Sequence, residues 1–175
     1  MASNGHWLTK FVRDIDDFPT AGVSFRDITP LLGDGDAFAR SIDELADRFD
    51  GVHADRVLGM EARGFIIAAP VAYRMGAGFV PVRKTGKLPW AVVREDYSLE
   101  YGQDKLEIHR DAVHPGEQIL VIDDVLATGG TAAATVRLVE ALGGVVAGVG
   151  FLIELEDLGG RAKLDGHRIE SLARY

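Results

Sequence analysis

Residues 118–131 read Q-I-L-V-I-D-D-V-L-A-T-G-G-T, and this stretch decides the fold. Four consecutive apolar residues, 119–122, lack the alternation of a strand with one solvated face. They predict a strand buried on both faces, as in a parallel sheet between helices. We expect the strand to stop at two carboxylates, Asp123 and Asp124. A glycine-rich turn follows, and apolar residues at helical spacing come next, so the stretch predicts a strand, a turn and a helix start.

The turn over residues 127–131 has the features of an anion site. Backbone N–H groups at a helix start are unpaired and lie at the positive end of the helix dipole, and Thr128 and Thr131 add hydroxyl donors. Carboxylates beside a phosphate would repel it, so Asp123 and Asp124 suit sugar hydroxyls or a cation. The stretch therefore predicts a site for a phosphorylated sugar, although the same connection also occurs in α/β proteins without a ligand.

Composition restricts the class of protein. The chain has 175 residues, 47% of them hydrophobic, which suits one globular domain. A net charge of -8 disfavours a general nucleic-acid binder, and the absence of cysteine excludes disulfides, thiolate zinc sites and a cysteine nucleophile. The N-terminus lacks the apolar core of a signal peptide, and no apolar run is long enough to span a bilayer. We therefore expect a cytoplasmic protein with no membrane partner.

Hydrophobic periodicity predicts strands alternating with helices along the chain. This order favours an α/β fold with a central, mainly parallel sheet flanked by helices, and with the ligand at the carboxyl edge of the sheet. Asp34 or Asp36 is the expected N-cap of its helix. Strands are predicted at 56–60, 79–84, 105–109, 119–122 and 145–155, and helices at 7–17, 34–49, from residue 64 and from 132 to 142.

Two segments lack a regular period. Residues 17–32 are interrupted by prolines and a glycine, so loops or short extended pieces are expected there. Residues 85–103 are also broken by proline and glycine, and a loop this long in a compact domain is usually functional or mobile. Pro81, within the preceding strand, indicates a sheet edge or a local irregularity.

The sequence V-I-D-D-V-L-A-T-G-G-T, residues 121–131, resembles the phosphoribosyl diphosphate (PRPP) motif of the type I phosphoribosyltransferases. In that family the acidic pair holds the ribose hydroxyls and the following turn holds the 5'-phosphate. The resemblance implies that Asp123 and Asp124 bind the ribose. It also implies a single domain over residues 1–175, with a hood formed by about residues 1–34 and the C-terminal segment and a lid loop over about residues 85–103. The implied 5'-phosphate ligands are Ala127, Thr128, Gly129, Gly130 and Thr131.

The segment F-P-T-A-G-V-S-F-R-D-I-T-P-L-L, residues 18–32, resembles the N-terminal hood of adenine phosphoribosyltransferases. There a phenylalanine stacks on the purine and nearby backbone groups read its edge. The resemblance implies a purine site at Ser24, Phe25 and Arg26, with Leu155 on the other face of the base. Stacking suits a planar base and is worth about 1–3 kcal/mol. Ser24 replaces an apolar residue of many relatives. Without the resemblance, Phe25 and Leu155 would be assigned to the core.

The segment G-M-E-A-R-G-F, residues 59–65, resembles the pyrophosphate loop of the same family. The resemblance implies that Glu61, Ala62 and Arg63 lie at the diphosphate. A guanidinium fork matches phosphate oxygens in a way that a lysine ammonium does not. Taken alone, the segment would be an ordinary strand-to-helix loop with a solvated glutamate and arginine.

Two signatures resemble the ends of the family's lid, which closes over the diphosphate. They are R-K-T-G-K-L-P at 83–89 and S-L-E-Y-G at 98–102, and Trp90 departs from the small residue often found after that proline. The resemblance implies that Glu100, together with Arg63, is catalytic, with Glu100 accepting or sharing a purine proton. The remaining diphosphate residues that it implies are Arg83, Lys84, Lys87 and Tyr101.

The resemblance as a whole covers residues 18–175. It implies transfer of a phosphoribosyl group from PRPP to adenine, giving AMP and diphosphate in purine salvage. Mg²⁺ would enter on PRPP near Asp123 and Asp124, without a dedicated protein cage. A homodimer is expected, with Arg83 near the neighbour's site. Two alternatives stay open: a hypoxanthine, guanine or xanthine enzyme, and a non-catalytic sensor of PRPP or purine.

Overall fold

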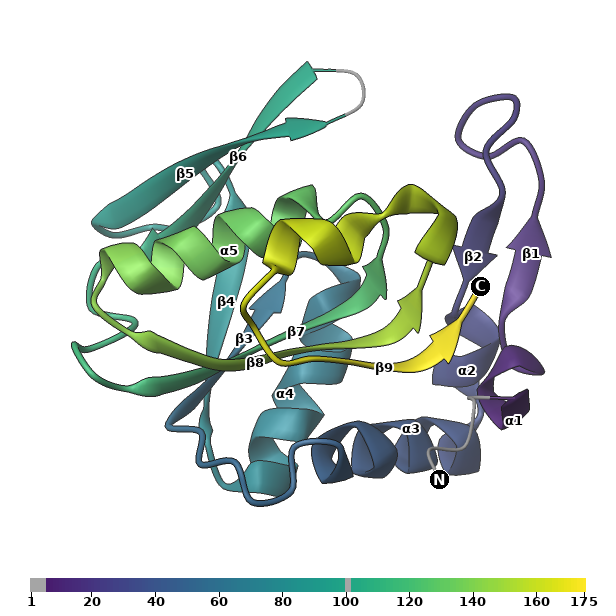
Figure 1. The fold of residues 1–175 in the computed structure, drawn as a ribbon, viewed down its shortest axis with the longest axis horizontal. Coiled ribbons are helices and arrows are strands. Elements are labelled where there is room, and N and C mark those ends of the chain that lie inside the picture. The colour runs from purple at the N-terminus through teal and green to yellow at the C-terminus, as the bar shows by residue number, and fades with distance from the viewer. Residues whose placement is uncertain (1–5, 100–101) are drawn as a thin grey trace.

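The computed structural model describes residues 6–99 and 102–175, which are organised around one large sheet (Figure 1). Its strands are β3 (Arg56–Met60), β4 (Gly78–Lys84), β5 (Val92–Leu99), β6 (Gly102–His109), β7 (Gln118–Leu126), β8 (Val145–Glu154) and β9 (Ile169–Arg174). They lie in the order β5-β6-β4-β3-β7-β8-β9. From β4 to β9 the neighbours run parallel, whereas β5 and β6 are antiparallel to each other and β6 is antiparallel to β4. The predicted α/β fold with a mainly parallel sheet is confirmed.

Helices cover both faces of this sheet. α3 (Gly35–Asp47) and α4 (Arg63–Met75) lie on one face, and α5 (Gly130–Ala141) lies on the other (Figure 1). These three helices agree with the predicted ones. In the described part of the chain, no helix combines the length and the apolar character that a membrane crossing would require.

Side chains of the central strand β7 pack into the hydrophobic cores on both faces of the sheet. Ile119 and Val121 pack in the cluster that contains the residues of α5, whereas Leu120 and Ile122 pack in the cluster formed with α3 and α4. All four side chains are fully buried. Because successive residues of a strand point to opposite faces, an unbroken apolar run requires cover on both sides. The prediction of a doubly buried strand is confirmed.

A small hood stands beside the end of the sheet. It contains α1 (His6–Thr9), the antiparallel pair β1 (Arg13–Ile15) and β2 (Phe25–Asp27), and α2 (Thr29–Gly33). After β8, two 3-10 turns, η1 (Glu156–Leu158) and η2 (Gly160–Leu164), lead to β9 at the sheet edge. Figure 1 shows the C-terminal strand and β2 side by side.

The expected helix over residues 7–17 is wrong beyond its first turn. The helix ends at Thr9, and residues 13–15 form β1 instead. Arg13 pairs with Asp27 and Ile15 with Phe25 across the two strands. Trp7 and Leu8 lie in the short helix, whereas Ile15 lies in β1, where pairing with β2 outweighs a weak local preference for helix.

The expected end of the central strand is also wrong. β7 continues through both aspartates to Leu126, because its pairing with β8 extends to Leu126 opposite Glu154. The carboxylates therefore stand within a rigid strand. This fixes their direction more firmly than a loop would.

Most of the segment expected as a loop at 85–103 belongs to a hairpin. Residues 92–99 form β5, which pairs along its length with β6, from Val92 opposite His109 to Leu99 opposite Gly102. The hairpin projects from the body of the molecule (Figure 1). The ladder joins residues of two successive strands, and a search for helical period does not detect such pairing.

Pro81 lies in β4, an interior strand, where a proline is unusual. At Pro81 the strand pairs with Gly59 of β3, whereas its pairing with β6 is confined to Arg83 and Lys84. One side of the strand is therefore free of ladder bonds to β6 at the proline. The register with β3 is regular at Pro81, so the structure has a local sheet edge there and not an irregularity.

The N-cap of α3 gives a prediction that separates two neighbouring aspartates. Asp34 accepts a hydrogen bond from the Ala37 amide at 2.9 Å, whereas Asp36 lies in the first turn. We expect Asp34→Ala to lower the stability by about 1 kcal/mol and the Tm by about 3 °C. The matched control Asp36→Ala loses only an interaction with the helix dipole and is expected to shift the Tm less. Thermal unfolding measures both, and equal shifts would contradict the assignment.

Candidate active site

A cavity of about 1100 Å³ opens at the carboxyl ends of β3 and β7. It is bounded by the hood on one side and by the turn after β7 on the other, so segments far apart in the sequence meet there. A cavity of this size accommodates a nucleotide-sized ligand. The predicted site residues that line it are Ser24, Phe25, Arg26, Glu61, Ala62, Arg63, Lys84, Asp123, Asp124, Ala127, Thr128, Thr131 and Leu155.

The other predicted residues lie elsewhere. Gly129 and Gly130 line a smaller cavity of about 70 Å³ that shares Asp123 with the large one. Arg83 and Lys87 are absent from the described lining of both. Glu100 and Tyr101 lie outside the described residues.

The cavity also contains residues that the sequence did not single out as ligand contacts. Tyr175 comes from the last position of the chain, and Tyr97 comes from the hairpin. Leu158 follows Leu155 by three positions in η1. Several of these residues lie close in sequence to a motif, which was the available signal for a place in the site. Whether their side chains face the cavity depends on packing between elements. The full set is Gly22, Val23, Tyr97, Leu106, Val125, Asp157, Leu158 and Tyr175.

The two aspartates of β7 form a compact acidic pair. The Asp124 amide donates to Asp123 Oδ1 at 3.0 Å, and Asp124 is only 5% exposed. A Cβ atom placed on Gly64 would lie 2.5 Å from the same Oδ1, so the start of α4 packs directly on this carboxylate. Burial, and then the negative charge of Asp124, raise the pKa of Asp123 well above its ordinary value. Both effects favour the neutral form of the Asp123 carboxyl group.

Arg63 contacts both the acidic pair of β7 and the aromatic ring of β2. Its Nε lies 2.5 Å from Asp124 Oδ2, and its guanidinium carbon lies 4.9 Å from the centre of the Phe25 ring. The opposite charge of Asp124 and the electron-rich ring face both favour the cation there. Phe18 meets Phe25 edge-on at a centroid distance of 5.2 Å, which orients the ring.

Backbone geometry supplies the anion site at the start of α5. Gly129 is the residue before the helix and has φ of 76°, a conformation that glycine adopts without strain. The N–H groups of the first helical turn have no carbonyl partner within the helix. Thr128 and Thr131 line the cavities beside them. The turn can therefore donate several hydrogen bonds to one phosphate group.

Arg83 connects the loop after β3 with the turn after β4. Its Nε donates to Glu61 Oε2 at 2.9 Å, and one terminal nitrogen donates to the Lys87 carbonyl at 3.1 Å. Within this chain it therefore positions the two segments predicted to meet the diphosphate. Lys84 reaches the cavity from the same strand, and the Lys87 side chain is exposed.

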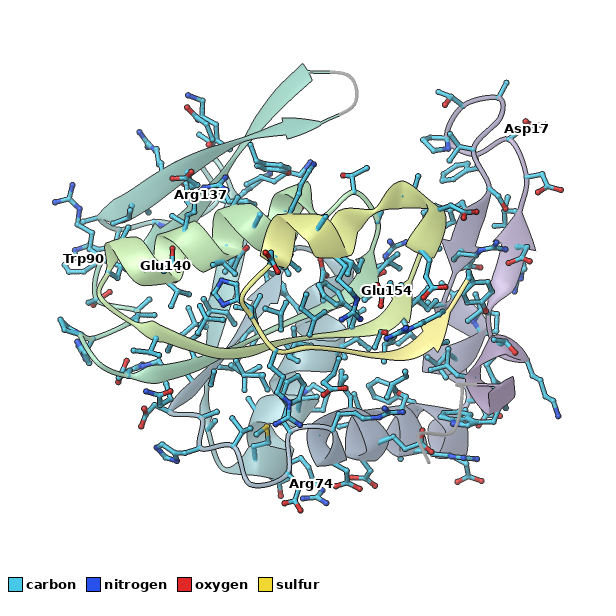
Figure 2. All side chains as sticks on the ribbon, viewed as in Figure 1. Asp17, Arg74, Trp90, Arg137, Glu140 and Glu154 are labelled. Atoms are coloured by element: carbon cyan, nitrogen blue, oxygen red, sulfur yellow. The ribbon has the colours of Figure 1, made fainter. Side chains whose placement is uncertain are left out.

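Ion pairs hold the base of the hairpin. Buried Glu107 accepts from Arg94 Nε at 2.6 Å and from the Gly86 amide at 3.0 Å. Burial opposes its charge, yet these hydrogen bonds keep the pKa of Glu107 below its usual value. Arg137 points from α5 towards the hairpin, and its Nε donates to Glu95 Oε1 at 2.5 Å (Figure 2). The hairpin is therefore held both to the turn after β4 and to α5.

The described residues contain no group of three or more acidic or histidine side chains arranged to hold a metal ion. The acidic pair nevertheless offers suitable oxygens. Asp124 Oδ2 is buried and, apart from its ion pair with Arg63, accepts no hydrogen bond from the described residues. Carboxylate oxygens suit Mg²⁺, which commonly binds through one or two carboxylates together with substrate phosphates.

Comparison with known proteins accounts for this combination of fold and cavity. The Phosphoribosyl transferase domain family matches residues 24–168. An adenine phosphoribosyltransferase of Desulfitobacterium hafniense (strain Y51) is 54% identical over 166 residues, which cover 95% of this chain and 96% of the relative. The chain belongs to the adenine phosphoribosyltransferase family.

Solved structures of adenine phosphoribosyltransferases have the same fold. The protein from Thermoanaerobacter pseudethanolicus is 50% identical, with a TM-score of 0.96 over 98% of this chain and 100% of that one. The Saccharomyces cerevisiae protein, complexed with D-2,5-dideoxy-2,5-imino-altritol 1,6-bisphosphate and adenine, is 37% identical. It has a TM-score of 0.91 over 98% of this chain and 99% of that one. The fold predicted for this phosphoribosyltransferase from its sequence motifs is thereby confirmed.

The raised pKa of Asp123 predicts a pH-dependent stability of this phosphoribosyltransferase. A carboxyl group whose pKa is raised in the folded state disfavours its ionised form there. The free energy of unfolding of the protein therefore falls as the pH rises above the pKa of that group in the unfolded chain, which is about 4. Asp123→Asn keeps an acceptor for the Asp124 amide and does not ionise. We expect its Tm to exceed that of the wild type at neutral pH, with a difference that shrinks towards pH 4.

Thermal unfolding between pH 4 and pH 8 measures this difference. The exposed Asp165→Asn variant is the matched control and is expected to follow the wild type across the range. A Tm difference for Asp123→Asn that does not change with pH would contradict the raised pKa.

Proposed function

We propose that the protein transfers the 5-phosphoribosyl group of PRPP to adenine, forming AMP and diphosphate in purine salvage. The observation that carries the proposal is the single cavity that joins Phe25 and Leu155 to Asp123, Asp124 and the turn before α5. An aromatic wall, an acidic pair and an anion cradle match the base, the sugar and the phosphate of a nucleotide. The shared name of the relatives supports adenine as the base.

Each half of the substrate has its own residues in this proposal. Phe25 and Leu155 sandwich the purine, while the backbone around Ser24 and Arg26 reads its edge. Asp123 and Asp124 accept hydrogen bonds from the ribose hydroxyls. The 5'-phosphate lies against the turn formed by Ala127, Thr128, Gly129, Gly130 and Thr131.

The diphosphate is bound by residues from three segments. Arg63 contributes a planar fork of donors that matches phosphate oxygens. The same guanidinium pairs with Asp124, which links the diphosphate site to the ribose site in this proposal. Lys84 and Lys87 add positive charge, and Arg83 holds Glu61 and the Lys87 turn in place. The remaining members of this site are Ala62 and Tyr101.

The reaction separates charge between the sugar and the leaving group. N9 of adenine forms a bond to C1 of the ribose while the bond from C1 to the diphosphate oxygen breaks, and the purine loses a proton. Cationic residues lower the barrier by stabilising the charge that develops on the leaving diphosphate. Glu100 accepts or shares the purine proton. In this proposal the lid over residues 85–103 excludes water, which would otherwise react with the cationic sugar.

Mg²⁺ is the expected cofactor, and oxygens of Asp123 and Asp124 would hold it together with the diphosphate. When bound, it neutralises negative charge on the diphosphate. The acidic pair supplies too few ligands for a cage of its own, which fits an ion that arrives on the substrate.

The protein is proposed to act as a cytoplasmic homodimer. Large apolar side chains are exposed on α4 and β4, where Ile66 is 43%, Tyr73 is 89% and Phe79 is 37% exposed. A cluster of exposed apolar side chains is typical of a protein interface. No nucleic-acid or membrane partner is part of the proposal.

A purine panel tests the proposed function directly. AMP, IMP, GMP and XMP formation is measured with PRPP and Mg²⁺ and with adenine, hypoxanthine, guanine or xanthine in turn. We expect turnover with adenine and at most a small fraction of that rate with the 6-oxopurines, because an exocyclic amine and a carbonyl present opposite hydrogen-bonding groups. Equal rates with 6-oxopurines would contradict the choice of base. Binding of PRPP without any nucleotide formation would indicate a sensor.

Substitution of Asp124 tests the ribose assignment. Asp124→Asn loses one anionic acceptor and leaves Arg63 without its charged partner, so we expect kcat/KM for PRPP to fall about tenfold or more. Asp111→Asn, on the exposed surface, is the matched control and is expected to behave as the wild type. Steady-state kinetics at saturating adenine measure both variants. Unchanged PRPP kinetics for Asp124→Asn would refute the assignment.

A further inference from the structure

We infer that Arg161 and Glu154 are positioning residues for the PRPP and purine subsites, acting through Gly160 and Leu155. Neither side chain is among the described residues that line the cavity. Each is adjacent in sequence to a residue that touches a binding element. The inference rests on the proposed function, because it takes the turn before α5 as the 5'-phosphate site.

Gly160 presses against the phosphate turn through backbone atoms. A Cβ atom on Gly160 would overlap the carbonyl oxygen of Ala127 and would lie 2.8 Å from the Gly129 amide nitrogen. A Cβ atom on Gly129 would in turn overlap the carbonyl oxygen of Gly160. Neither side has a flexible side chain at this contact that could move away. Any shift of η2 is therefore transmitted to the turn.

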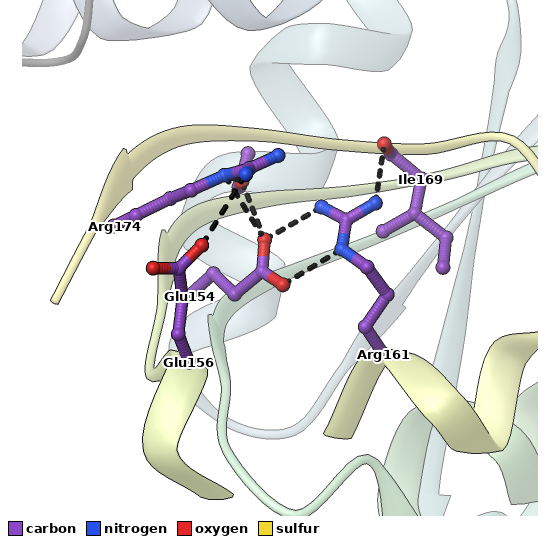
Figure 3. Close-up of polar contacts among 6 residues, drawn as sticks. Glu154, Glu156, Arg161, Ile169 and Arg174 are labelled. Atoms are coloured by element: carbon purple, nitrogen blue, oxygen red, sulfur yellow. Dashed lines mark hydrogen bonds and ion pairs between the residues drawn. The ribbon is translucent and has the colours of Figure 1, made fainter. Parts of the chain in front are cut away.

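Arg161 is the residue that fixes η2 to the sheet (Figure 3). Its Nε donates to Glu154 Oε1 at 2.8 Å and one terminal nitrogen donates to Glu154 Oε2 at 2.6 Å. Its other terminal nitrogen donates to the Ile169 carbonyl at 3.2 Å. The planar guanidinium is thus held in its plane by two strands, β8 and β9. This geometry requires arginine, because a lysine ammonium cannot form the same fork.

Hydrogen bonds and ion pairs favour the charged form of the buried Glu154 carboxylate. It is 4% exposed, and Ser171 Oγ donates to its Oε2 at 2.8 Å. Arg174 lies 3.6 Å from the same oxygen and also pairs with Glu156 at 3.3 Å. The hydrogen bonds from Arg161 hold the pKa of Glu154 below its usual range, against the effect of burial. The ion pair is therefore present at neutral pH.

The same cluster reaches the purine side of the cavity. Leu155 follows Glu154 directly, and its amide donates to the Leu126 carbonyl at 2.9 Å. The Tyr175 amide donates to the Glu154 carbonyl, and the Glu156 amide donates to the Tyr175 carbonyl, both at 2.9 Å. Leu155 and Tyr175 both line the cavity. One buried ion pair thus sets the position of a purine wall and of the phosphate turn.

A purely structural role and a positioning role of this ion pair predict different ligand affinities for folded variants. If the pair only stabilised the fold, variants that remain folded would bind ligands as the wild type does. If it positions the turn, folded variants lose affinity for the phosphoribosyl group itself. Ribose 5-phosphate is a suitable probe, because its binding requires neither the diphosphate residues nor the purine wall.

The decisive variants are Gly160→Ala and Arg161→Lys. Calorimetry gives the Kd for ribose 5-phosphate, and steady-state assays give KM for PRPP and kcat with adenine. We expect both variants to raise the Kd and the KM for PRPP about tenfold or more, because displacement of a binding group by about 1 Å is costly. We expect kcat at saturating substrates to change much less. The double variant Glu154→Gln/Arg161→Gln removes the pair without leaving a buried charge and is expected to show the same pattern.

The controls separate this effect from general damage. Gly35→Ala adds a methyl group with no heavy atom within 4 Å, and Lys163→Gln removes an exposed charge from η2 itself. Both are expected to match the wild type. Variants that fold and bind ribose 5-phosphate with wild-type affinity would overturn the inference, and a loss confined to Tm would do the same. Wild-type protein that forms no AMP would instead refute the proposed function, while the binding measurement would still report on the turn.

Discussion

The parallel pairing of β3 with β7 is the constraint on which the rest of the structure depends. Gly59 stands opposite Ile122 in this pair, so the loop after β3 and the aspartates of β7 emerge at the same edge of the sheet. The start of α4 can then pack on Asp123 only because residue 64 is glycine. The loop after β3 and the aspartates of β7, which are far apart in the sequence, are thereby brought within one cavity.

The rest of the site is arranged around this edge by pairs of opposite charges. Arg63 bridges towards Asp124, Arg83 towards Glu61, and Arg161 towards Glu154. Each arginine connects two segments that are distant in sequence or belong to different elements. In such partly buried pairs the geometry of the guanidinium fork contributes specificity as well as energy. Together these pairs connect α4 with β7, the loop after β3 with β4, and η2 with β8.

Elements whose formation depends on residues close together in the chain could be predicted from the sequence. The doubly buried run at 119–122, the turn at 127–131 and the helices at 34–49 and from residue 64 follow from apolar period and backbone chemistry, and the structure has them. The helix expected at 7–17 and the loop expected at 85–103 were wrong for a common reason. Both segments form strands whose partners lie elsewhere in the chain, and local period does not report such pairing.

The sequence by itself determined the fold class, the family and the residue types of the cavity, because these depend on patterns within short stretches. It did not determine that Asp123 and Asp124 stand inside a strand, nor that Arg63 lies between Asp124 and Phe25. Only the tertiary structure decided that Gly160 abuts the turn before α5 and that Tyr175 lines the cavity. Contacts of this kind depend on the register of non-adjacent strands and on close packing between backbones, and neither leaves a periodic signal in the sequence.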